Sequence, residues 1–321
     1  EKWKRPNGLN ISKVSIPIGV IGIIYESRPN VTSDVASLCF KSGNPVILKG
    51  GSEAFYSNLI LSKLFRKSLK KNKVDENFVQ FINIKNRAVV DILLNKMTKF
   101  IDVIIPRGGK GLIETVVSLA RMPVIKHYDG ICHAYIHSDA DLEMAVKIVV
   151  DSKTQKPSVC NALETLLVDE SIASEFLPKV ASALMEKNVE LRGDVTTCAI
   201  IDAKVAVEED WSTEYLDYIL AIKVVPSMDA SMAHINKYSS QHTEVIVTKN
   251  EAIAEAFLCR IDSACVFHNV STRYSDGEEF GFGAEIGIST DKLHARGPMG
   301  LRELTSYQYR VRGEGQLKGS V

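Results

Sequence analysis

The sequence predicts an α/β protein whose parallel strands are covered by helices. Short apolar runs alternate along the chain with longer segments of helical period, and two of these runs end in glycine-rich turns. Strands that alternate with helices are typical of a parallel sheet with helices on both faces. At 321 residues, the chain is long enough to form two domains, each with its own core.

In the first part of the chain, apolar runs predict short buried strands, and periodic segments predict the helices between them. The expected strands are 20–25, 45–49, 78–82, 101–105 and 123–126, and the expected helices are 52–71, 87–97 and 112–121. We therefore expect a parallel-sheet domain over residues 1–128. The chain opens on Glu1 with a polar segment that resembles the interior of a longer protein, so an N-terminal piece of this domain is expected to be missing.

A second α/β unit is expected over residues 129–297. Ser138 is the expected N-cap of a helix whose apolar face includes Leu142 and Val149. A further helix is expected at 170–187, and strands are expected at 166–168, 199–201, 221–225, 243–248 and 264–268.

The C-terminal segment, residues 298–321, contains a stretch of strict alternation from Ser306 to Arg312. This pattern predicts an exposed strand. An exposed strand edge invites pairing with another subunit, and a lone hairpin arm is the alternative.

Composition argues against several classes of partner. Lys and Arg number 39 and Asp and Glu also number 39, so nothing indicates a nucleic acid or a membrane surface. No apolar stretch is long enough to span a bilayer, and no secretory leader is visible. Six cysteines are scattered without CxxC spacing, which predicts reduced thiols in the cytoplasm and no metal site.

Cys160 is the strongest candidate for a reactive group. It lies on a polar, proline-containing loop between an amphipathic helix and the apolar run 165–168. A thiolate presented on such a loop is a strong nucleophile. The alternative is a small apolar residue in an ordinary turn.

Two glycine-rich turns follow predicted strands of the first domain. Residues 106–111 and 49–53 each join the end of a strand to the start of a helix. Backbone amides and a helix N-terminus favour a phosphate, and two such turns on neighbouring strands are typical of a nucleotide site. Ordinary glycine-rich connections are the alternative.

Other polar segments suit a binding site without requiring one. Asn30 could direct its amide at an oxyanion or could be a simple turn residue. Residues 233–244 are rich in His and hydroxyl groups, and they could form a solvated loop or the wall of a site. Glycine-rich segments near Glu285 and Arg296 have a composition found in ligand-wrapping loops and in common turns.

Together these segments resemble the aldehyde dehydrogenase superfamily, and within it the γ-glutamyl phosphate reductase family of proline biosynthesis. The same pattern is similar to the C-terminal half of bifunctional pyrroline-5-carboxylate synthases. The resemblance covers essentially the whole chain, in the segments 24–32, 48–54, 105–112, 157–164, 233–244 and 293–301. It implies a Rossmann-like parallel-sheet cofactor domain, an α/β catalytic domain and a small oligomerisation arm.

The resemblance also implies roles for individual residues. It makes Cys160 the nucleophile and Asn30 a donor to the oxyanion, together with the backbone amide of Cys160. The implied cofactor is NADPH or NADP, and the small side chain of Ser52 would leave room for a 2′-phosphate. The implied cofactor-binding residues are Lys49, Ser52, Arg107, Gly108, Gly109 and Glu285. Candidate substrate contacts, by their place beside the motifs, are Arg28, His242, His294 and Arg296.

The implied reaction is the NADPH-dependent reduction of L-glutamyl 5-phosphate to L-glutamate 5-semialdehyde and phosphate through a cysteinyl thioester. Hydrolytic aldehyde dehydrogenases carry a Glu that activates water, whereas the matching stretch 127–130 has none. This absence favours a reductase, with His127 and Asp129 as the alternative bases.

Two other functions remain open from the sequence. Another acylating aldehyde dehydrogenase would share the thiol and differ in the pocket, and a truncated scaffold would bind cofactor poorly. The resemblance further implies a homo-oligomer, either dimer or tetramer, and an association with glutamate 5-kinase.

Overall fold

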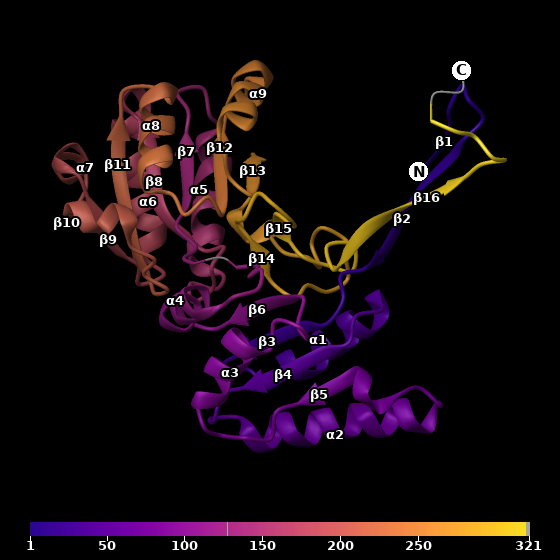
Figure 1. Ribbon diagram of the computed structural model, residues 1–321. Helices are drawn as coiled ribbons and strands as arrows, with labels where there is room; N and C mark the ends of the chain where they lie inside the picture. The colour runs from indigo at the N-terminus through magenta and orange to yellow at the C-terminus, as the bar shows by residue number, and fades with distance from the viewer. Residues whose placement is uncertain (127, 319–321) are drawn as a thin grey trace. The chain divides into compact units, whose positions relative to one another are not determined.

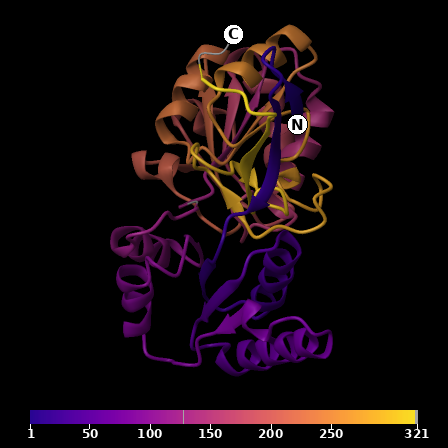
Figure 2. The same ribbon diagram turned by 45° about the vertical axis from the view of Figure 1, so that its right-hand side comes forward.

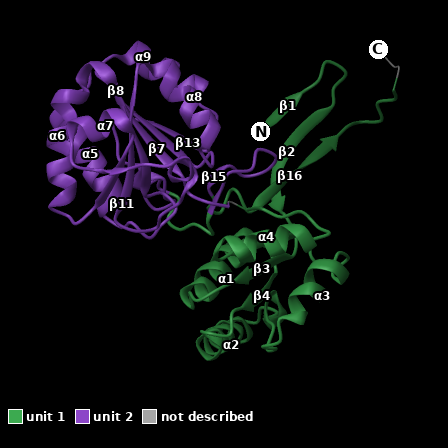
Figure 3. Ribbon diagram, turned by 90° about the vertical axis from the view of Figure 1, so that its left-hand side faces the viewer, with its two compact units in different colours: residues 1–126, 282–287, 299–321 green, residues 127–281, 288–298 purple. Residues whose placement is uncertain are grey.

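The computed structural model describes residues 1–126 and 128–318, and these form two compact units (Figures 1 and 3). Unit 1 contains residues 1–126, 282–287 and the segment from 299 onward. Unit 2 contains the intervening residues up to 281, together with 288–298. The units exchange segments, whereas the sequence-based domains 1–128, 129–297 and 298–321 are contiguous, so that division stays a prediction.

Unit 1 is built on a four-stranded parallel sheet with the order β5-β4-β3-β6. From β3 the chain adds strands in one direction and then returns to place β6 on the other side, which makes a topological switch point. Tyr25 at the end of β3 pairs with both Gly50 and Arg107, so the carboxyl ends of three strands meet there. The strands are β3 (Ile21–Tyr25), β4 (Val46–Gly50), β5 (Val79–Phe81) and β6 (Val103–Arg107).

Helices cover both faces of this sheet. On one face, Ile24 packs in a cluster with Val116 of α4 and with side chains of α3. Tyr25 points to the opposite face because side chains alternate along a strand. The Tyr25 hydroxyl lies 2.6 Å from the Thr32 hydroxyl in α1. The Thr32 hydroxyl in turn donates to the side-chain oxygen of Asn58 in α2. The helices are α1 (Asn30–Ser42), α2 (Phe55–Lys71), α3 (Ala88–Lys96) and α4 (Lys110–Leu119), with a 3₁₀ turn η1 (Glu76–Phe78).

A separate three-stranded antiparallel sheet in unit 1 joins the first strands of the chain to the last (Figure 2). Its order is β1 (Lys2–Lys4), β2 (Asn10–Pro17), β16 (Thr305–Arg312), so β16 is an edge strand. Tyr307, Tyr309 and Val311 on β16 are exposed. The predicted exposed C-terminal strand is therefore confirmed, and β1 and β2 were not predicted.

Unit 2 is built on a seven-stranded parallel sheet with the order β10-β9-β11-β8-β7-β12-β13. Three adjacent inner strands, β8, β7 and β12, are buried along their whole length, as parallel strands covered on both faces should be. The strands are β7 (Cys132–Ile136), β8 (Leu163–Asp169), β9 (Glu190–Gly193), β10 (Lys204–Val205), β11 (Ile219–Val225), β12 (Thr243–Val247) and β13 (Cys265–His268).

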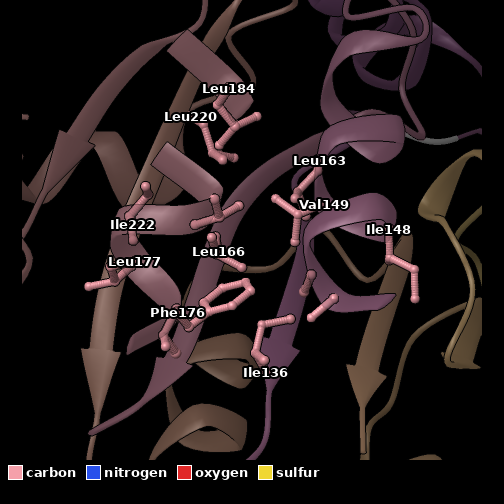
Figure 4. Close-up of a cluster of buried hydrophobic side chains, with 14 of the residues drawn as sticks. Ile136, Ile148, Val149, Leu163, Leu166, Phe176, Leu177, Leu184, Leu220 and Ile222 are labelled. Carbon is pink, nitrogen blue, oxygen red and sulfur yellow. The ribbon is translucent and has the colours of Figure 1, made fainter. Parts of the chain in front are cut away.

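The core of unit 2 has one layer on each side of this sheet. Figure 4 shows Val149 of α5 and Phe176 of α6 packed around Leu166 of β8. On the opposite face, Leu167 packs with Phe257 of α9 and with side chains of α8. The helices are α5 (Leu142–Thr154), α6 (Glu170–Met185), α7 (Val195–Ile200), α8 (Met228–Tyr238) and α9 (Glu251–Arg260). Short elements are η2 (Glu208–Ser212), η3 (Thr272–Tyr274), β14 (Ile288–Ser289) and β15 (Gly297–Pro298).

The α/β class with parallel sheets is confirmed, and three local predictions are wrong. Residues 199–201 end helix α7 instead of forming a strand, because the Asp194 side chain caps a helix there by accepting from the Thr197 amide. Of the expected strand 123–126, only an isolated bridge at Val124 forms. The N-cap of α5 is Asp141, whose side chain accepts from two backbone amides, and not Ser138.

Candidate active site

Cys160 lies on the loop 155–162 that joins the end of α5 to the start of β8. Its side chain is partly exposed. Cys132 opens the neighbouring strand β7, where it pairs with Leu163. The candidate nucleophile therefore lies at the amino-terminal edge of the sheet of unit 2, opposite to the edge where doubly wound sheets bind nucleotides.

The backbone of Cys160 is held closely by the segment 130–132. The Cys132 thiol donates to the carbonyl oxygen of Cys160 at 3.3 Å. A Cβ atom at Gly130 would lie 1.9 Å from the same oxygen, so only glycine allows this approach. The backbone amide of Gly130 donates to Oε1 of Glu214 at 2.8 Å. These contacts fix the position of the peptide unit that carries the thiol.

The next residue anchors the loop from another direction. Asn161 is buried, and its side-chain amide donates to the carbonyl oxygens of Ser275 at 2.9 Å and Arg273 at 3.3 Å. The loop that carries Cys160 is thus held from two directions, by Cys132 at the carbonyl of Cys160 and by the segment 273–275 at Asn161.

Two of the other thiols are unsuited to nucleophilic attack. Burial raises the pKa of Cys132 well above its usual value, and the negative charge of Glu244 raises it further. Burial likewise raises the pKa of Cys39 to about 12. A thiol that stays protonated is a hydrogen-bond donor and not a nucleophile, which matches the contact from Cys132 to Cys160.

In unit 1, Asn30 is the first residue of α1 and is exposed. Its amide nitrogen donates to Oδ2 of Asp34 at 2.9 Å. An amide nitrogen carries two hydrogens, so the bond to Asp34 uses one of them. Arg28 lies in the turn before α1 and is also exposed. Both lie shortly after the end of β3, at the switch point of the small sheet.

The two predicted phosphate turns follow β4 and β6, which lie on either side of β3 in the sheet of unit 1. The amide of Gly51 donates to the carbonyl of Tyr25 at 2.7 Å, and the amide of Glu26 donates to that of Arg107 at 3.0 Å. Lys49 is buried, and its ammonium donates to the carbonyl of Gly50 at 2.8 Å. Burial is the main reason that the pKa of Lys49 is lowered. Both turns therefore lie beside the end of β3, but the prediction that they follow neighbouring strands is wrong, because β3 separates β4 from β6.

The turn before α4 holds a carboxylate on its backbone amides. Gly109 is the N-cap of α4, and its amide donates to Oε2 of Glu26 at 3.1 Å. A Cβ atom at Gly108 would lie 2.4 Å from that oxygen, whereas a Cβ atom at Gly109 would meet nothing within 4 Å. Amides at a helix N-terminus that donate to a carboxylate suit a phosphate equally well. The turn therefore fits an anionic cofactor group, which would have to displace Glu26.

Glu26 was not among the predicted site residues. Its signal was its place directly after a buried strand and before a proline-containing turn. Sequence reasoning cannot pair it with Gly109, because 83 positions separate the two residues.

The remaining cofactor candidates lie in unit 1 as well. Gly287 has a φ of 154° and packs against Arg107, since a Cβ atom there would lie 2.6 Å from Nη1 of that residue. This contact brings the segment that carries Glu285, which is partly buried, to the end of β6. Ser52 is exposed, and its hydroxyl donates to Oε1 of Glu53 at 3.2 Å.

The candidate substrate contacts in unit 2 occupy different surroundings. His242 is fully buried, with Nδ1 at 2.8 Å from the Thr243 hydroxyl and 3.8 Å from the Cys132 sulfur. Arg296 donates to Oδ1 of Asp262 at 2.7 Å. His294 is exposed in the loop between β14 and β15. His242 therefore lies beside the residues that support Cys160, whereas Arg296 is engaged by a carboxylate.

The polar stretch 233–244 forms the end of α8, a short turn and the start of β12. Glu244 in this stretch is fully buried and accepts from the backbone amide of His133 at 3.0 Å and from the Ser263 hydroxyl at 3.2 Å. Ser239 also donates to Glu244. This part of the stretch is an internal hydrogen-bond network and not a solvated loop.

Among the described residues, no group of three or more His, Cys, Asp or Glu side chains is arranged to hold a metal ion. Within the same ranges, no helix is long and apolar enough to cross a membrane.

Comparison with known proteins agrees with this architecture. The profile of the aldehyde dehydrogenase family matches residues 3–209. A γ-glutamyl phosphate reductase of Nautilia profundicola is 54% identical over 98% of this chain and 77% of its own length. The corresponding protein of Petrotoga mobilis is 56% identical over 99% of this chain and 76% of its own length. The chain belongs to the γ-glutamyl phosphate reductase family.

Solved structures agree with membership of the γ-glutamyl phosphate reductase family. The crystal structure of the Thermotoga maritima γ-glutamyl phosphate reductase superposes with a TM-score of 0.97 at 48% identity, over 99% of this chain and 77% of that one. An acetylating aldehyde dehydrogenase of Geobacillus thermoglucosidasius shares the fold, with a TM-score of 0.74 at 18% identity, over 97% of this chain and 78% of that one. The resemblance drawn from the sequence is confirmed.

Proposed function

We propose that this chain reduces L-glutamyl 5-phosphate to L-glutamate 5-semialdehyde and phosphate, with NADPH as the reductant. The support is its membership of the γ-glutamyl phosphate reductase family, combined with a partly exposed thiol on a tightly anchored loop. The anchored thiol of Cys160 is the single observation that carries the mechanism.

The first chemical step belongs to Cys160. Its thiolate attacks the acyl carbon of the substrate, a carbon–sulfur bond forms, and the bond to the phosphate oxygen breaks. Inorganic phosphate leaves, and a thioester remains on Cys160. The clamp formed by Gly130, Cys132 and Asn161 keeps the sulfur in one orientation during attack.

The oxyanion formed during attack needs hydrogen-bond donors. We assign this role to the side-chain amide of Asn30 and the backbone amide of Cys160. One such donor typically contributes about 3 kcal/mol to stabilisation of the transition state. Because Asp34 accepts one hydrogen of the Asn30 amide, it also limits rotation of that amide.

The residues that would hold NADPH belong to unit 1. Lys49 and the turn of Arg107, Gly108 and Gly109 supply cationic and backbone donors for phosphate and ribose groups, and Glu285 supplies a carboxylate for ribose hydroxyls. Ser52 presents a small side chain where a 2′-phosphate needs room. When bound, the cofactor supplies the hydride that reduces the thioester. Collapse of the resulting tetrahedral adduct frees the aldehyde and returns the sulfur of Cys160.

Reduction requires that water does not compete for the thioester. In the stretch 127–130, which matches the segment that carries the water-activating Glu of hydrolytic enzymes, the carboxylate is Asp129, and His127 lies outside the described residues. We assign neither residue the role of a base, and we expect the thioester to partition to aldehyde.

Substrate contacts and partners are further parts of the proposal. We retain Arg28, His294 and Arg296 as candidate contacts for the phosphate and carboxylate of the substrate. We place His242 behind Cys132 as a support, because its side chain is fully buried. The exposed edge of β16 supports assembly into a homo-oligomer, either dimer or tetramer. A cytoplasmic location and an association with glutamate 5-kinase remain predictions.

The decisive experiment follows the reverse reaction. Glutamate 5-semialdehyde, phosphate and NADP⁺ are mixed with the protein, and the appearance of NADPH is measured by absorbance. We expect turnover with the parent chain and none above background with Cys160→Ala, because the alanine cannot form the thioester.

Cys259→Ala is the matched control, since it removes an exposed thiol on α9. It should retain the parent rate. Turnover by Cys160→Ala at the parent rate would contradict the proposed mechanism. Faster turnover with an aldehyde other than glutamate semialdehyde would favour another acylating aldehyde dehydrogenase.

A further inference from the structure

A buried ion pair joins the helix and the strand on either side of the Cys160 loop. Lys153 lies in the last turn of α5, and Glu164 is the second residue of β8. The Lys153 ammonium donates to Oε2 of Glu164 at 2.7 Å, and both side chains are fully buried. The pair thus closes the base of the loop that carries Cys160.

The pair also ties this loop to a third segment. Oε1 of Glu164 accepts from the backbone amide of Leu216 at 3.3 Å. Two residues earlier, Glu214 accepts from the amide of Gly130, which lies against the Cys160 carbonyl. The contacts therefore run from Glu164 through the segment 214–216 to Gly130 and return to the loop at Cys160. A shift of Glu164 would therefore move the end of α5 through Lys153 and the segment 214–216 through Leu216.

Stability alone does not explain a buried ion pair at this place. Burial disfavours the charged form of both side chains. It therefore raises the pKa of Glu164 to about 7 and lowers the pKa of Lys153. Apolar side chains of similar volume often stabilise a core as well as such a pair does, or better. An ion pair supplies directional hydrogen bonds that an apolar pair lacks, and these bonds fix one arrangement of the elements they join.

We propose that Lys153 and Glu164 are positioning residues for Cys160, which hold the two ends of its loop in the arrangement that aligns the thiol for attack. Neither side chain touches Cys160 or the substrate in this role. The inference rests on the proposed function of Cys160 as the nucleophile, and it assigns to this buried pair a task beyond folding.

The test combines turnover with chemical labelling of individual cysteines. The variants are Glu164→Gln, which keeps the shape of the side chain, and the double variant Lys153→Met/Glu164→Leu, which leaves no unpaired buried charge. In both we expect kcat of the reverse reaction to fall by roughly 10- to 100-fold, as misplacement of a reacting group does. KM for the semialdehyde and NADP⁺ should stay within about twofold, because contacts to bound substrate are unchanged.

Labelling by iodoacetamide, followed for each cysteine peptide by mass spectrometry, reports the state of the loop without any turnover. A loosened loop exposes the sulfur, so Cys160 should be alkylated several-fold faster in the variants than in the parent. Cys39 in unit 1 and Cys265 in unit 2 are buried, and their continued protection shows that both units remain folded. Exposed Cys259 calibrates the reagent.

An exposed ion pair of the same residue types is the matched control. Lys179 donates to Oε1 of Glu175 on α6, also at 2.7 Å, but both side chains lie at the surface. The double variant Lys179→Met/Glu175→Leu should leave kcat and the labelling of Cys160 unchanged.

Three results would overturn the proposal. The first is a double variant with protected Cys39 and Cys265 that keeps the parent kcat and the parent labelling rate. The second is loss of protection in both variants, because the pair would then be required for folding and not for placing the thiol. The third is an equal effect of the Lys179 control. If the parent itself shows no turnover, the proposed function fails, and the labelling of Cys160 still decides the role of the pair.

Discussion

At the scale of single residues, the site depends on how closely atoms approach Cys160. Gly130 allows the chain to pass directly over the carbonyl of that residue, and the neighbouring Cys132 donates to the same oxygen. Neither residue carries a reactive group in the proposed mechanism. Their effect is to limit the positions open to the peptide that bears the thiol.

Gly130→Ala should lower both stability and turnover. The added Cβ atom would lie 1.9 Å from the Cys160 oxygen and 2.5 Å from its Cα atom, and because these are backbone atoms the loop itself must move. We expect a loss of about 1–3 kcal/mol in the free energy of unfolding and a fall of about 100-fold in kcat. Urea unfolding and the reverse-reaction assay measure the two effects.

Gly111→Ala serves as the stability control for that experiment, because a Cβ atom at this position in α4 meets nothing within 4 Å. It should be at least as stable as the parent, since alanine favours helix. Equal stability of the parent and Gly130→Ala would show that the loop adapts freely.

A second residue-scale prediction concerns acid stability. His234 is buried among the rings of Trp211, Tyr238 and His133, with centroid distances of 5.4, 4.6 and 5.6 Å. Burial, with smaller contributions from His133 and from the positive charges of Lys223 and Lys237, lowers its pKa from 6.5 to about 3. Between these two pH values the unfolded chain binds a proton that the folded chain does not. Stability is therefore complete above pH 6.5 and is lost as the pH falls toward 3.

His234→Phe should flatten this dependence. The parent loses up to about 1.4 kcal/mol per pH unit from this group, and the variant loses none from it. Urea unfolding at several pH values between 6.5 and 4 measures the slope, whatever the stability of the variant at neutral pH. An unchanged slope would mean that other groups control acid unfolding.

The residues that the sequence could predict are those that stand in recognisable motifs. Cys160, Lys49 and the glycines of the 106–111 turn became candidates in this way. Glu26, Glu214 and the support from Cys132 were not found, because their contacts join positions that only the fold brings together. Periodicity and turn chemistry describe neighbours along the chain, and a site is assembled from neighbours in space.

At the scale of elements, the hydrophobic pattern of the sequence predicted most strands and helices. Where a helix begins depended on individual capping side chains. The buried strands β3, β4, β8 and β12 coincide with apolar runs. The short run 199–201 was assigned to a strand, because three apolar residues fit either period. In the structure the Asp194 side chain starts a helix, and the run becomes its final turn.

The two candidate caps of α5 can be separated by experiment. Oδ1 of Asp141 accepts from the amides of Glu143 and Met144, both at 3.1 Å, whereas the Ser138 side chain lies near His137 before the helix begins. Asp141→Ala should lower the melting temperature by about 2–4 °C, as loss of an N-cap does in a chain of this size.

Ser138→Ala should leave the melting temperature of the chain unchanged within error. Differential scanning fluorimetry of the two variants compares them directly. An equal fall in the melting temperature of both variants would mean that both side chains stabilise the first turn of α5.

At the scale of the whole molecule, the order of strands explains where the predicted groups lie. In unit 1 the reversal between β3 and β6 gathers the two glycine-rich turns at one sheet edge. In unit 2, Cys160 lies at the amino-terminal edge of the sheet, which the general rule for doubly wound sheets does not predict. The α/β class was predictable because both units repeat one strand–helix pattern. The exchange of segments 282–287 and 288–298 was not, since it leaves no periodic signal.

The pairing of β2 with β16 has a consequence for biosynthesis. The ribosome makes residues 10–17 well before residues 305–312, yet the two strands share eight aligned pairs. While the residues between them are being synthesised, the nascent β2 therefore has one hydrogen-bonding edge without its final neighbour. Closure of this ribbon must wait until residues 305–312 have left the ribosome, so the unpaired edge is a point at which chains from adjacent ribosomes can pair with each other instead.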